Sequence, residues 1–151
     1  MGLKVQYRCA SPNVGDIQMK PHVNVVNTSN VSVPLSSLKV RYYFTIDAGS
    51  PNLVFDCDYA APGAGACGNI TSSFVMASGM NTDHYLELGF SGGTLGPGMA
   101  TGEIQARVHK MDFSVWNQAN DYSFDPTKLA FADWDKVTLT QSGALVWGVV
   151  P

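Results

Sequence analysis

Residues 116–124 (WNQANDYSF) concentrate side-chain oxygens in a stretch that follows neither a helical nor a strand period. Asn117, Asn120 and Asp121 can direct amide and carboxylate oxygens toward one point, and a hard cation such as Ca²⁺ binds oxygens of this kind. The same spacing is also typical of Asx turns, in which Asn and Asp side chains bond to their own backbone. From these residues alone, a metal loop and an ordinary turn both stay open.

Two pairs of carboxylates could do acid–base chemistry. Asp56/Asp58 and Asp133/Asp135 each stand two residues apart, so each pair could share a strand face as the carboxylates of a glycosidase do. A solvated face or a turn explains such pairs more simply. The three histidines lie inside expected strands beside apolar neighbours, which is typical of sheet-face residues rather than bases. With no hydrolase, zinc-protease or P-loop motif in the sequence, we expect no enzyme activity.

Cys9, Cys57 and Cys67 show none of the spacings of a zinc site. Residues 57–67 (CDYAAPGAGAC) are rich enough in Gly and Ala to fold back on themselves, so Cys57 and Cys67 could form a disulfide in an exported protein. Two separate thiols are an equally good interpretation of this spacing. Cys9 is expected to stay free on the first strand.

The elements that position these residues are strands, because apolar or aromatic residues alternate with polar ones in eight segments. The segments are residues 3–9, 20–27, 38–47, 70–77, 84–90, 103–109, 136–140 and 144–150. Turns rich in Gly, Asn and Pro separate them. The pattern predicts an all-β fold of eight or nine antiparallel strands packed as a sandwich. Only residues 125–131 carry a helix start signal, Asp125 followed by Pro126, and they predict at most a single turn.

Composition bounds the domain organisation and the partners. The 151 residues fit one domain, residues 1–151, with a core of its own. The net charge is −3 without a basic cluster, so nucleic acid is not an expected partner. No apolar run approaches the roughly 18 residues of a membrane span, and the Met1-Gly2 start shows no signal peptide. The compartment therefore has to be inferred from other features.

Nine segments, in this order and spacing, resemble the family 3 carbohydrate-binding modules of bacterial cellulases, cellulosomal scaffold proteins and related biomass-sensing proteins. They are LKVQY, VNTSN, PLSSLKVRYYFTID, CDYAA, GNITSSF, YLELGFSGGTLGPG, IQARV, NDYSF and LVWGVVP. RYYFTID, NDYSF and VWG are specific in combination, and the resemblance covers essentially the entire chain. It implies a nine-stranded antiparallel β-sandwich with jelly-roll topology, a structural calcium ion, a flat cellulose-binding face on one sheet and a shallow groove on the other.

For loop 116–124, the resemblance favours calcium. It implies a Ca²⁺ site built by two loops that are distant in sequence. The implied ligands are Thr45, Asp47, Asn117, Asn120 and Asp121. Tyr122 and Phe124 are then expected to be core anchors that return the chain to the sandwich, whereas Trp116 fits either the core or the surface.

The resemblance also implies a strip of side chains on which glucose rings stack. Asp58 and Arg107 match the family's ion pair, Tyr59 stands where the family usually has His, and Phe113 stands where it has Trp. The family's loop Tyr falls on or next to Cys67. Aromatic rings suit this task because each pyranose presents an apolar C–H face. Polar anchoring positions are matched well by Gln105 and more loosely by Ser11 and Asn13.

These matches imply a monomeric, extracellular, non-catalytic module that binds cellulose or a related β-glucan. It would target a covalently linked catalytic, scaffold or sensor domain to the plant cell wall. The alternative is a module of the kind fused to family 9 glycoside hydrolases, which lacks the strip and packs against the enzyme without binding crystalline cellulose itself. The altered aromatics keep this alternative open, but an Asp58–Arg107 pair beside two aromatics favours retained binding.

Overall fold

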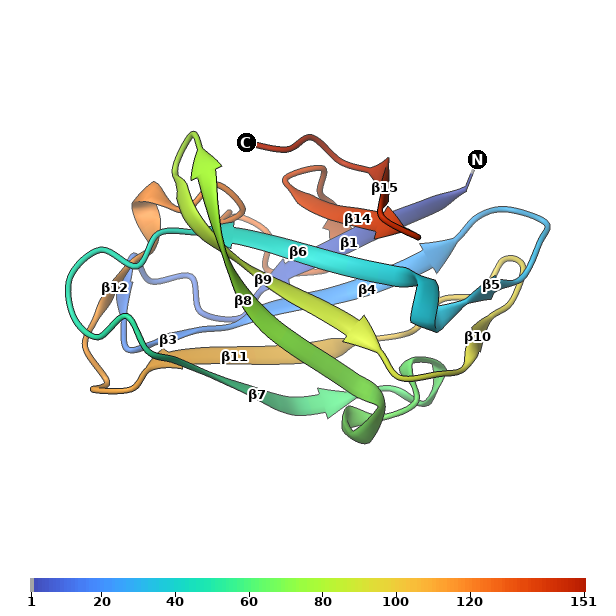
Figure 1. Ribbon diagram of the computed structural model, residues 1–151, viewed down its shortest axis with the longest axis horizontal. Helices are drawn as coiled ribbons and strands as arrows, with labels where there is room; N and C mark the ends of the chain where they lie inside the picture. The colour runs from blue at the N-terminus through green and yellow to red at the C-terminus, as the bar shows by residue number, and fades with distance from the viewer. Residues whose placement is uncertain (1) are drawn as a thin grey trace.

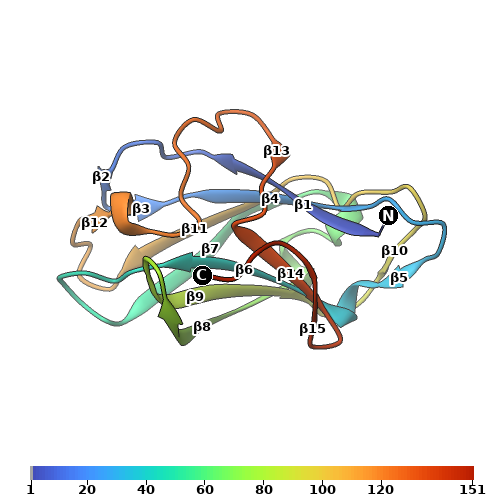
Figure 2. The ribbon, with the colours of Figure 1, turned by 90° about the horizontal axis from the view of Figure 1, so that it is seen from above.

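The computed structural model describes residues 2–151, so Met1 of the expected 1–151 domain lies outside the described part. Two antiparallel sheets pack face to face with the hydrophobic core between them (Figures 1 and 2). This arrangement is the predicted all-β sandwich.

Sheet I has the strand order β13-β1-β4-β11-β3, and β7 also pairs with β11. Its strands are β1 (Leu3–Cys9), β3 (Gln18–Met19), β4 (Pro21–Asn27), β7 (Leu53–Ala60), β11 (Ile104–Lys110) and β13 (Ala132–Asp133). In β1 and β11, buried and half-exposed residues alternate strictly, because one face of the sheet lies on the core and the other faces solvent. Sheet I therefore presents a polar outer face.

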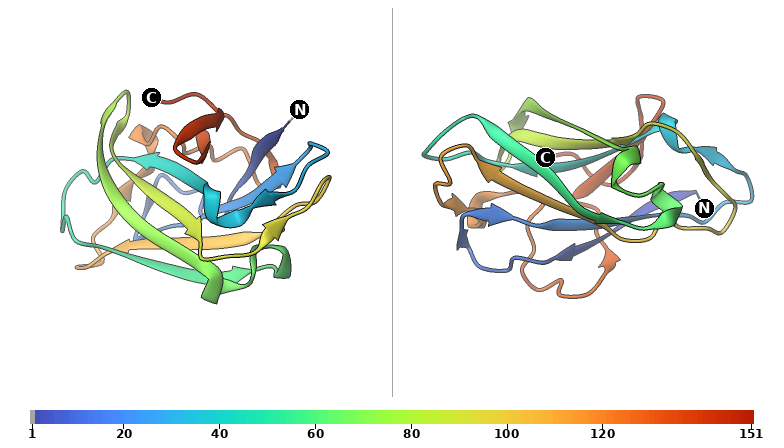
Figure 3. Two further views of the ribbon diagram at one scale, coloured as in Figure 1. Left: turned by 45° about the vertical axis from the view of Figure 1, so that its right-hand side comes forward. Right: turned by 90° about the horizontal axis from the view of Figure 1, so that it is seen from below.

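Sheet II has the order β15-β14-β6-β9-β8. Its strands are β6 (Leu38–Phe44), β8 (Ile70–Gly79), β9 (Thr82–Phe90), β14 (Val137–Gln141) and β15 (Ala144–Trp147). The segment between β7 and β8 carries the chain from sheet I to sheet II at one end of the sandwich (Figure 3).

Short elements complete the fold. Two small ladders pair β2 (Gly15–Asp16) with β12 (Trp116–Asn117) and β5 (Val33–Pro34) with β10 (Thr94–Leu95). The helical segments of residues 2–151 are four turns of three residues each, far shorter than a membrane crossing requires. They are the 3-10 turns Leu35–Ser37, Pro62–Ala64, Cys67–Asn69 and Gln118–Asn120. Residues 125–131 form no helix, and Asp125 instead accepts a hydrogen bond from the Thr127 amide within a turn.

The eight predicted strands are found, most with shifted ends, whereas one long strand and the two-residue strands were not predicted. The segment predicted as 38–47 ends at Phe44, and that predicted as 144–150 ends at Trp147. The longer missed strand is β7, in which a bulge opposite Gln105 and Ala106 leaves both Asp58 and Tyr59 exposed.

Two aromatics of loop 116–124 lie in or against the core, and the third does not. Trp116 is 1% exposed and packs edge-on against Phe44, and Phe124 packs against the same core. The prediction that Tyr122 is a core anchor is wrong. Its ring meets Tyr43 edge-on, and its hydroxyl donates to the Val149 carbonyl, because the chain passes over the end of sheet II at this point.

Candidate functional site

The bulge in β7 creates the centre of the candidate site. Tyr59 lies opposite Gln105 and Cys57 opposite Ala106, so Asp58 is the extra residue between two paired positions. A bulge of this kind redirects side chains, and Asp58 and Tyr59 are both exposed although they are adjacent in sequence. The strand that presents the predicted site is thus the one whose alternation is broken.

Asp58 and Arg107 form the predicted ion pair. Nε of Arg107 lies 3.0 Å from each carboxylate oxygen of Asp58, and Nη2 lies 3.0 Å from Oδ1. Asp56 approaches the same guanidinium from the other side, with 3.4 Å between its Oδ2 and Nη1. The hydrogen bond to Asp58 raises the pKa of Arg107. The guanidinium is therefore held flat and charged between two carboxylates.

We call the Asp58–Arg107 ion pair the platform. An exposed aromatic ring lies toward each end of it. Tyr59 is 46% exposed beside Gln105, and Phe113 is 53% exposed beyond the end of β11. The Phe113 ring stacks on His109, two residues from Arg107 on the same face of β11. At about 3.3 Å per residue, β11 separates Gln105 from His109 by about 13 Å. Aromatic, ionic and aromatic groups follow one another along the sheet, and we call Tyr59, Asp58, Arg107 and Phe113 the strip.

The predicted polar anchors differ in what they can offer. Gln105 lies on the outer face beside Tyr59, and its amide donates to Glu103 at 2.9 Å. Asn13 is exposed in the loop after β1. Ser11, in contrast, is 5% exposed and its hydroxyl donates to Asp16 at 2.6 Å. The structure therefore gives Ser11 a contact inside its own loop, and the strip does not include it.

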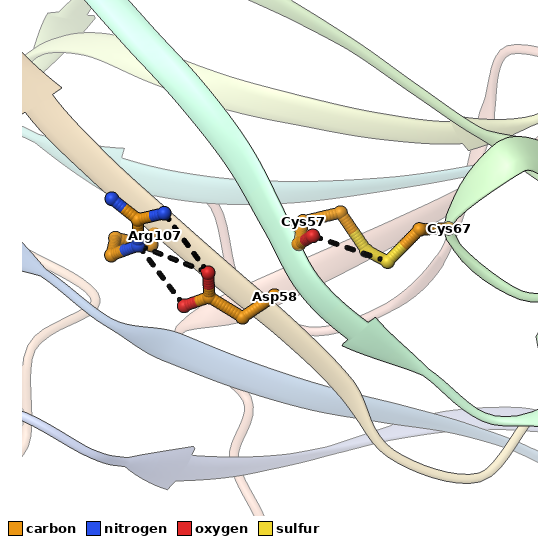
Figure 4. The surroundings of a disulfide bond; sticks show 4 residues. All are labelled: Cys57, Asp58, Cys67 and Arg107. Carbon is orange, nitrogen blue, oxygen red and sulfur yellow. Dashed lines mark hydrogen bonds and ion pairs between the residues drawn. A yellow bond between two sulfur atoms is a disulfide. The ribbon is translucent and has the colours of Figure 1, made fainter.

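A disulfide joins Cys57 to Cys67 beside the platform, so of the two alternatives that their spacing leaves open the disulfide is the one found. Figure 4 shows the neighbouring residues Cys57 and Asp58 directed to different partners, the sulfur of Cys67 and the guanidinium of Arg107. The crosslink thereby fixes the end of β7 that carries Asp58. Cys9 is buried with a free thiol, as expected.

Two loops bring a second set of oxygens together at the end of sheet II. The Thr45 hydroxyl lies 3.1 Å from Oδ2 of Asp47, 2.7 Å from Oδ1 of Asn120 and 3.0 Å from Oδ1 of Asp121. The Asn120 amide also donates to Asp47 at 2.6 Å. We call these four residues the oxygen cluster. Asn117, the fifth predicted ligand, is exposed, and its side-chain oxygen caps the turn by accepting from the Ala119 amide.

Asp121 is the most unusual member of the oxygen cluster. It is 5% exposed, and its Oδ2 is buried without a hydrogen-bond partner. Burial raises its pKa to about 7, although hydrogen bonds from Thr45 oppose this change and the charges of Asp47 and Asp83 add to it. A buried carboxylate that faces other carboxylates favours a positive charge nearby.

The oxygen cluster suits a hard cation in the chemical type of its ligand atoms. It offers carboxylate, amide and hydroxyl oxygens, the ligands that Ca²⁺ prefers, and one of these oxygens is orphaned. Within residues 2–151 no three His, Cys, Asp or Glu side chains gather as a metal site, so any cation here would depend on the neutral oxygens of Thr45 and Asn120 as well.

Lys110 connects the oxygen cluster to the strip. It is the last residue of β11 and fully buried, and its ammonium donates to the carbonyl of Ala48, next to Asp47. The same ammonium lies 3.4 Å from the carbonyl of Val115, two residues beyond Phe113. Burial lowers the pKa of Lys110. One side chain thus joins the loop of the oxygen cluster to the turn that carries Phe113.

Sequence reasoning gave Asp56 and His109 no part in the site. For Asp56 the signal was present, because a D-x-D pair opposite an Arg on a neighbouring strand places both carboxylates within reach of one guanidinium. A solvated face or a turn is nevertheless the simpler explanation of such a pair from sequence alone. His109 carries no such signal, since its stacking on Phe113 depends on a turn conformation that the sequence does not reveal.

Comparison with known proteins gives consistent matches over the whole chain. The CBM_3 family model, described as Cellulose binding domain, matches residues 4–148. An "Uncharacterized protein in celA 5'region" of Paenibacillus lautus is 48% identical and aligns with 97% of this chain and 100% of its own length. Endoglucanase A of Paenibacillus lautus is 47% identical over 99% of this chain, which spans only 21% of that enzyme.

A solved structure agrees with both. The carbohydrate-binding module CBM3b from the cellulosomal cellobiohydrolase 9A of Clostridium thermocellum superposes with a TM-score of 0.89 at 44% identity, covering 99% of this chain and 97% of that one. This likeness confirms the predicted jelly-roll β-sandwich.

Proposed function

Because the chain belongs to the cellulose binding domain family, CBM_3, we propose that it is a non-catalytic module that binds cellulose through its strip. The observation that carries this proposal is the Asp58–Arg107 platform with an exposed aromatic toward each end. A flat face suits an insoluble polymer, because a single glucan chain can meet all the groups of the strip at once.

Binding divides between two kinds of contact. The rings of Tyr59 and Phe113 cover apolar C–H faces of glucose units, at low cost in conformational entropy. Between them, the Arg107 guanidinium, held in place by Asp58, offers N–H donors to hydroxyl groups. Each contact is weak alone, so adsorption depends on several of them acting together on one surface.

We extend the proposal to the setting of the protein. In Endoglucanase A a matching segment occupies about a fifth of the enzyme. This chain would likewise bring a covalently linked catalytic, scaffold or sensor domain to cellulose. It would act outside the cell, because an insoluble ligand does not enter the cell and the Cys57–Cys67 disulfide suits an oxidising compartment. We propose that it does so as a monomer.

We also propose that the oxygen cluster holds a structural Ca²⁺ ion. Thr45, Asp47, Asn120 and Asp121 would supply oxygens to it, and the cation would balance the buried charge of Asp121. The ion would take no part in chemistry. Because a ligand that binds only the native state stabilises it, chelation should lower the melting temperature. An unchanged melting curve in excess chelator, with no metal found by elemental analysis, would contradict this site.

The test of cellulose binding is adsorption of the purified chain to microcrystalline and to regenerated amorphous cellulose. We expect saturable adsorption to at least one of them. Absence of adsorption to every insoluble glucan would overturn the proposal and favour the alternative, in which the module packs against a glycoside hydrolase domain.

A further inference from the structure

We propose that His109 is a positioning residue for cellulose binding, which holds the ring of Phe113 in one plane without touching the polymer. This inference rests on the proposed function, since it concerns how the strip reaches its binding geometry.

Phe113 needs support from elsewhere in the molecule. It lies in the turn after β11, which is closed by a hydrogen bond of 2.9 Å from its own amide to the Lys110 carbonyl. Its φ angle is +55°, in the left-handed region that bulky L-residues rarely adopt. More than half of the side chain is exposed. A ring in this position would sample several rotamers if no neighbour restricted it.

His109 supplies that restriction. The two ring centroids are 4.3 Å apart and the rings are nearly parallel, with 8° between their planes. His109 therefore covers one face of the Phe113 ring, while the exposed half of that side chain stays available to a ligand. The His109 side chain itself is only 11% exposed, so it is a fixed support.

The imidazole of His109 is oriented by a hydrogen bond at one nitrogen. Nδ1 lies 2.8 Å from the Lys110 carbonyl, and because a carbonyl oxygen can only accept, Nδ1 carries the hydrogen of this bond. Nε2 faces Oδ2 of Asp56 at 4.0 Å, and the same Oδ2 contacts Arg107. The hydrogen bond at Nδ1 and the burial of the side chain fix the imidazole plane, and the Phe113 ring stacks on that plane.

A ring that is already in its bound orientation loses less conformational freedom when it meets the polymer. Loss of the His109 ring should therefore weaken adsorption, even though no contact with glucose is removed. From the usual strength of an aromatic pair, the expected loss is about two- to tenfold in the adsorption constant.

The test is a double-mutant cycle of adsorption to cellulose. The variants are His109→Ala, His109→Phe, Phe113→Ala and the double variant His109→Ala/Phe113→Ala, each checked for its melting temperature. His109→Ala should weaken adsorption by the factor given above, and His109→Phe, which keeps a flat ring, should restore most of it. In the Phe113→Ala background, His109→Ala should change adsorption no further.

The NMR signals of the Phe113 ring give a second measurement. In His109→Ala they should lose the ring-current shift caused by stacking, with no change in the signals of the core. Full adsorption by His109→Ala, or an equal loss in the Phe113→Ala background, would overturn the inference and leave the proposed function standing. Wild type that does not adsorb at all would overturn both.

Discussion

The strip and the oxygen cluster are both built around aspartates, but they differ in how directly a positive charge meets those aspartates. In the strip, Asp58 and Asp56 share the guanidinium of Arg107 at the surface. In the oxygen cluster, Asp121 is buried, meets only neutral donors and lies near the like charges of Asp47 and Asp83. In the strip a guanidinium contacts its carboxylates directly, whereas the buried Lys110 ammonium near the oxygen cluster donates to the Ala48 and Val115 carbonyls and Oδ2 of Asp121 has no hydrogen-bond partner. Removing groups from the strip should therefore affect binding, and leaving the cluster without a cation should affect stability.

The largest effect is expected from the pH dependence of the metal-free protein. The pKa of Asp121 is about 7 in the folded chain and about 3.9 when unfolded, so the native state holds its proton more tightly. The stability contribution of protonated Asp121 is complete below pH 4 and is lost as the pH rises through 7, by about 4 kcal/mol. Urea unfolding in chelator between pH 4 and pH 8 measures this loss. Excess calcium should abolish this loss of stability at high pH. Identical pH profiles of the unfolding free energy with and without calcium would contradict a cation requirement of the oxygen cluster.

The disulfide ranks second. Replacing both partners, Cys57→Ser with Cys67→Ser, opens a loop of 10 residues and should lower the free energy of unfolding by something under about 3 kcal/mol. Denaturant unfolding measures the loss, and Cys9→Ser is the control for removal of a thiol as such. Thiol titration of the oxidised, denatured wild type should count one free cysteine, and a count of three would show that the bond does not form.

Replacement of both strip aromatics ranks third and acts on binding alone. Tyr59→Ala with Phe113→Ala should weaken cellulose adsorption well over tenfold, about 2 kcal/mol, because both stacking contacts are lost. The melting temperature should change little, since both rings are about half exposed. Tyr85→Ala on the outer face of sheet II is the matched control and should adsorb like wild type, so equal losses in both variants would place binding elsewhere.

The smallest effect on stability is expected from Asp58→Asn, which tests whether the strip affects binding rather than stability. Asp58→Asn leaves Arg107 with Asp56 as its carboxylate partner, and ion pairs this exposed contribute only about 0.2–1 kcal/mol to stability. The unfolding free energy should therefore change by less than about 1 kcal/mol. Adsorption should still weaken, because the guanidinium loses its bidentate partner and its fixed plane. A large loss of stability would show that the platform is part of the framework.

The sequence predicted the sandwich and most strands because alternation records which face of a strand is buried. In β7 the alternation covers only part of the strand: Leu53, Phe55 and Cys57 pack against the core, and the bulge then turns both Asp58 and Tyr59 outward. Local order in the chain also does not reveal which oxygens face one another: Thr45, Asn120 and Asp121 meet, while Asn117 caps its own turn. Nor does the sequence reveal that Ser11 is buried and donates to Asp16 within its own loop.

The placement of β1 in sheet I has a consequence for how the chain folds. β1 pairs with β4 on one side and with β13 on the other, so Gln6 lies opposite Asp133. Likewise β6, near residue 40, pairs with β14, near residue 140. Such pairings close very long loops, and the entropy of closure is lost before contacts compensate for it. Folding is therefore expected in milliseconds to seconds rather than microseconds. A chain emerging from the ribosome cannot complete either sheet until almost its whole length has been synthesised.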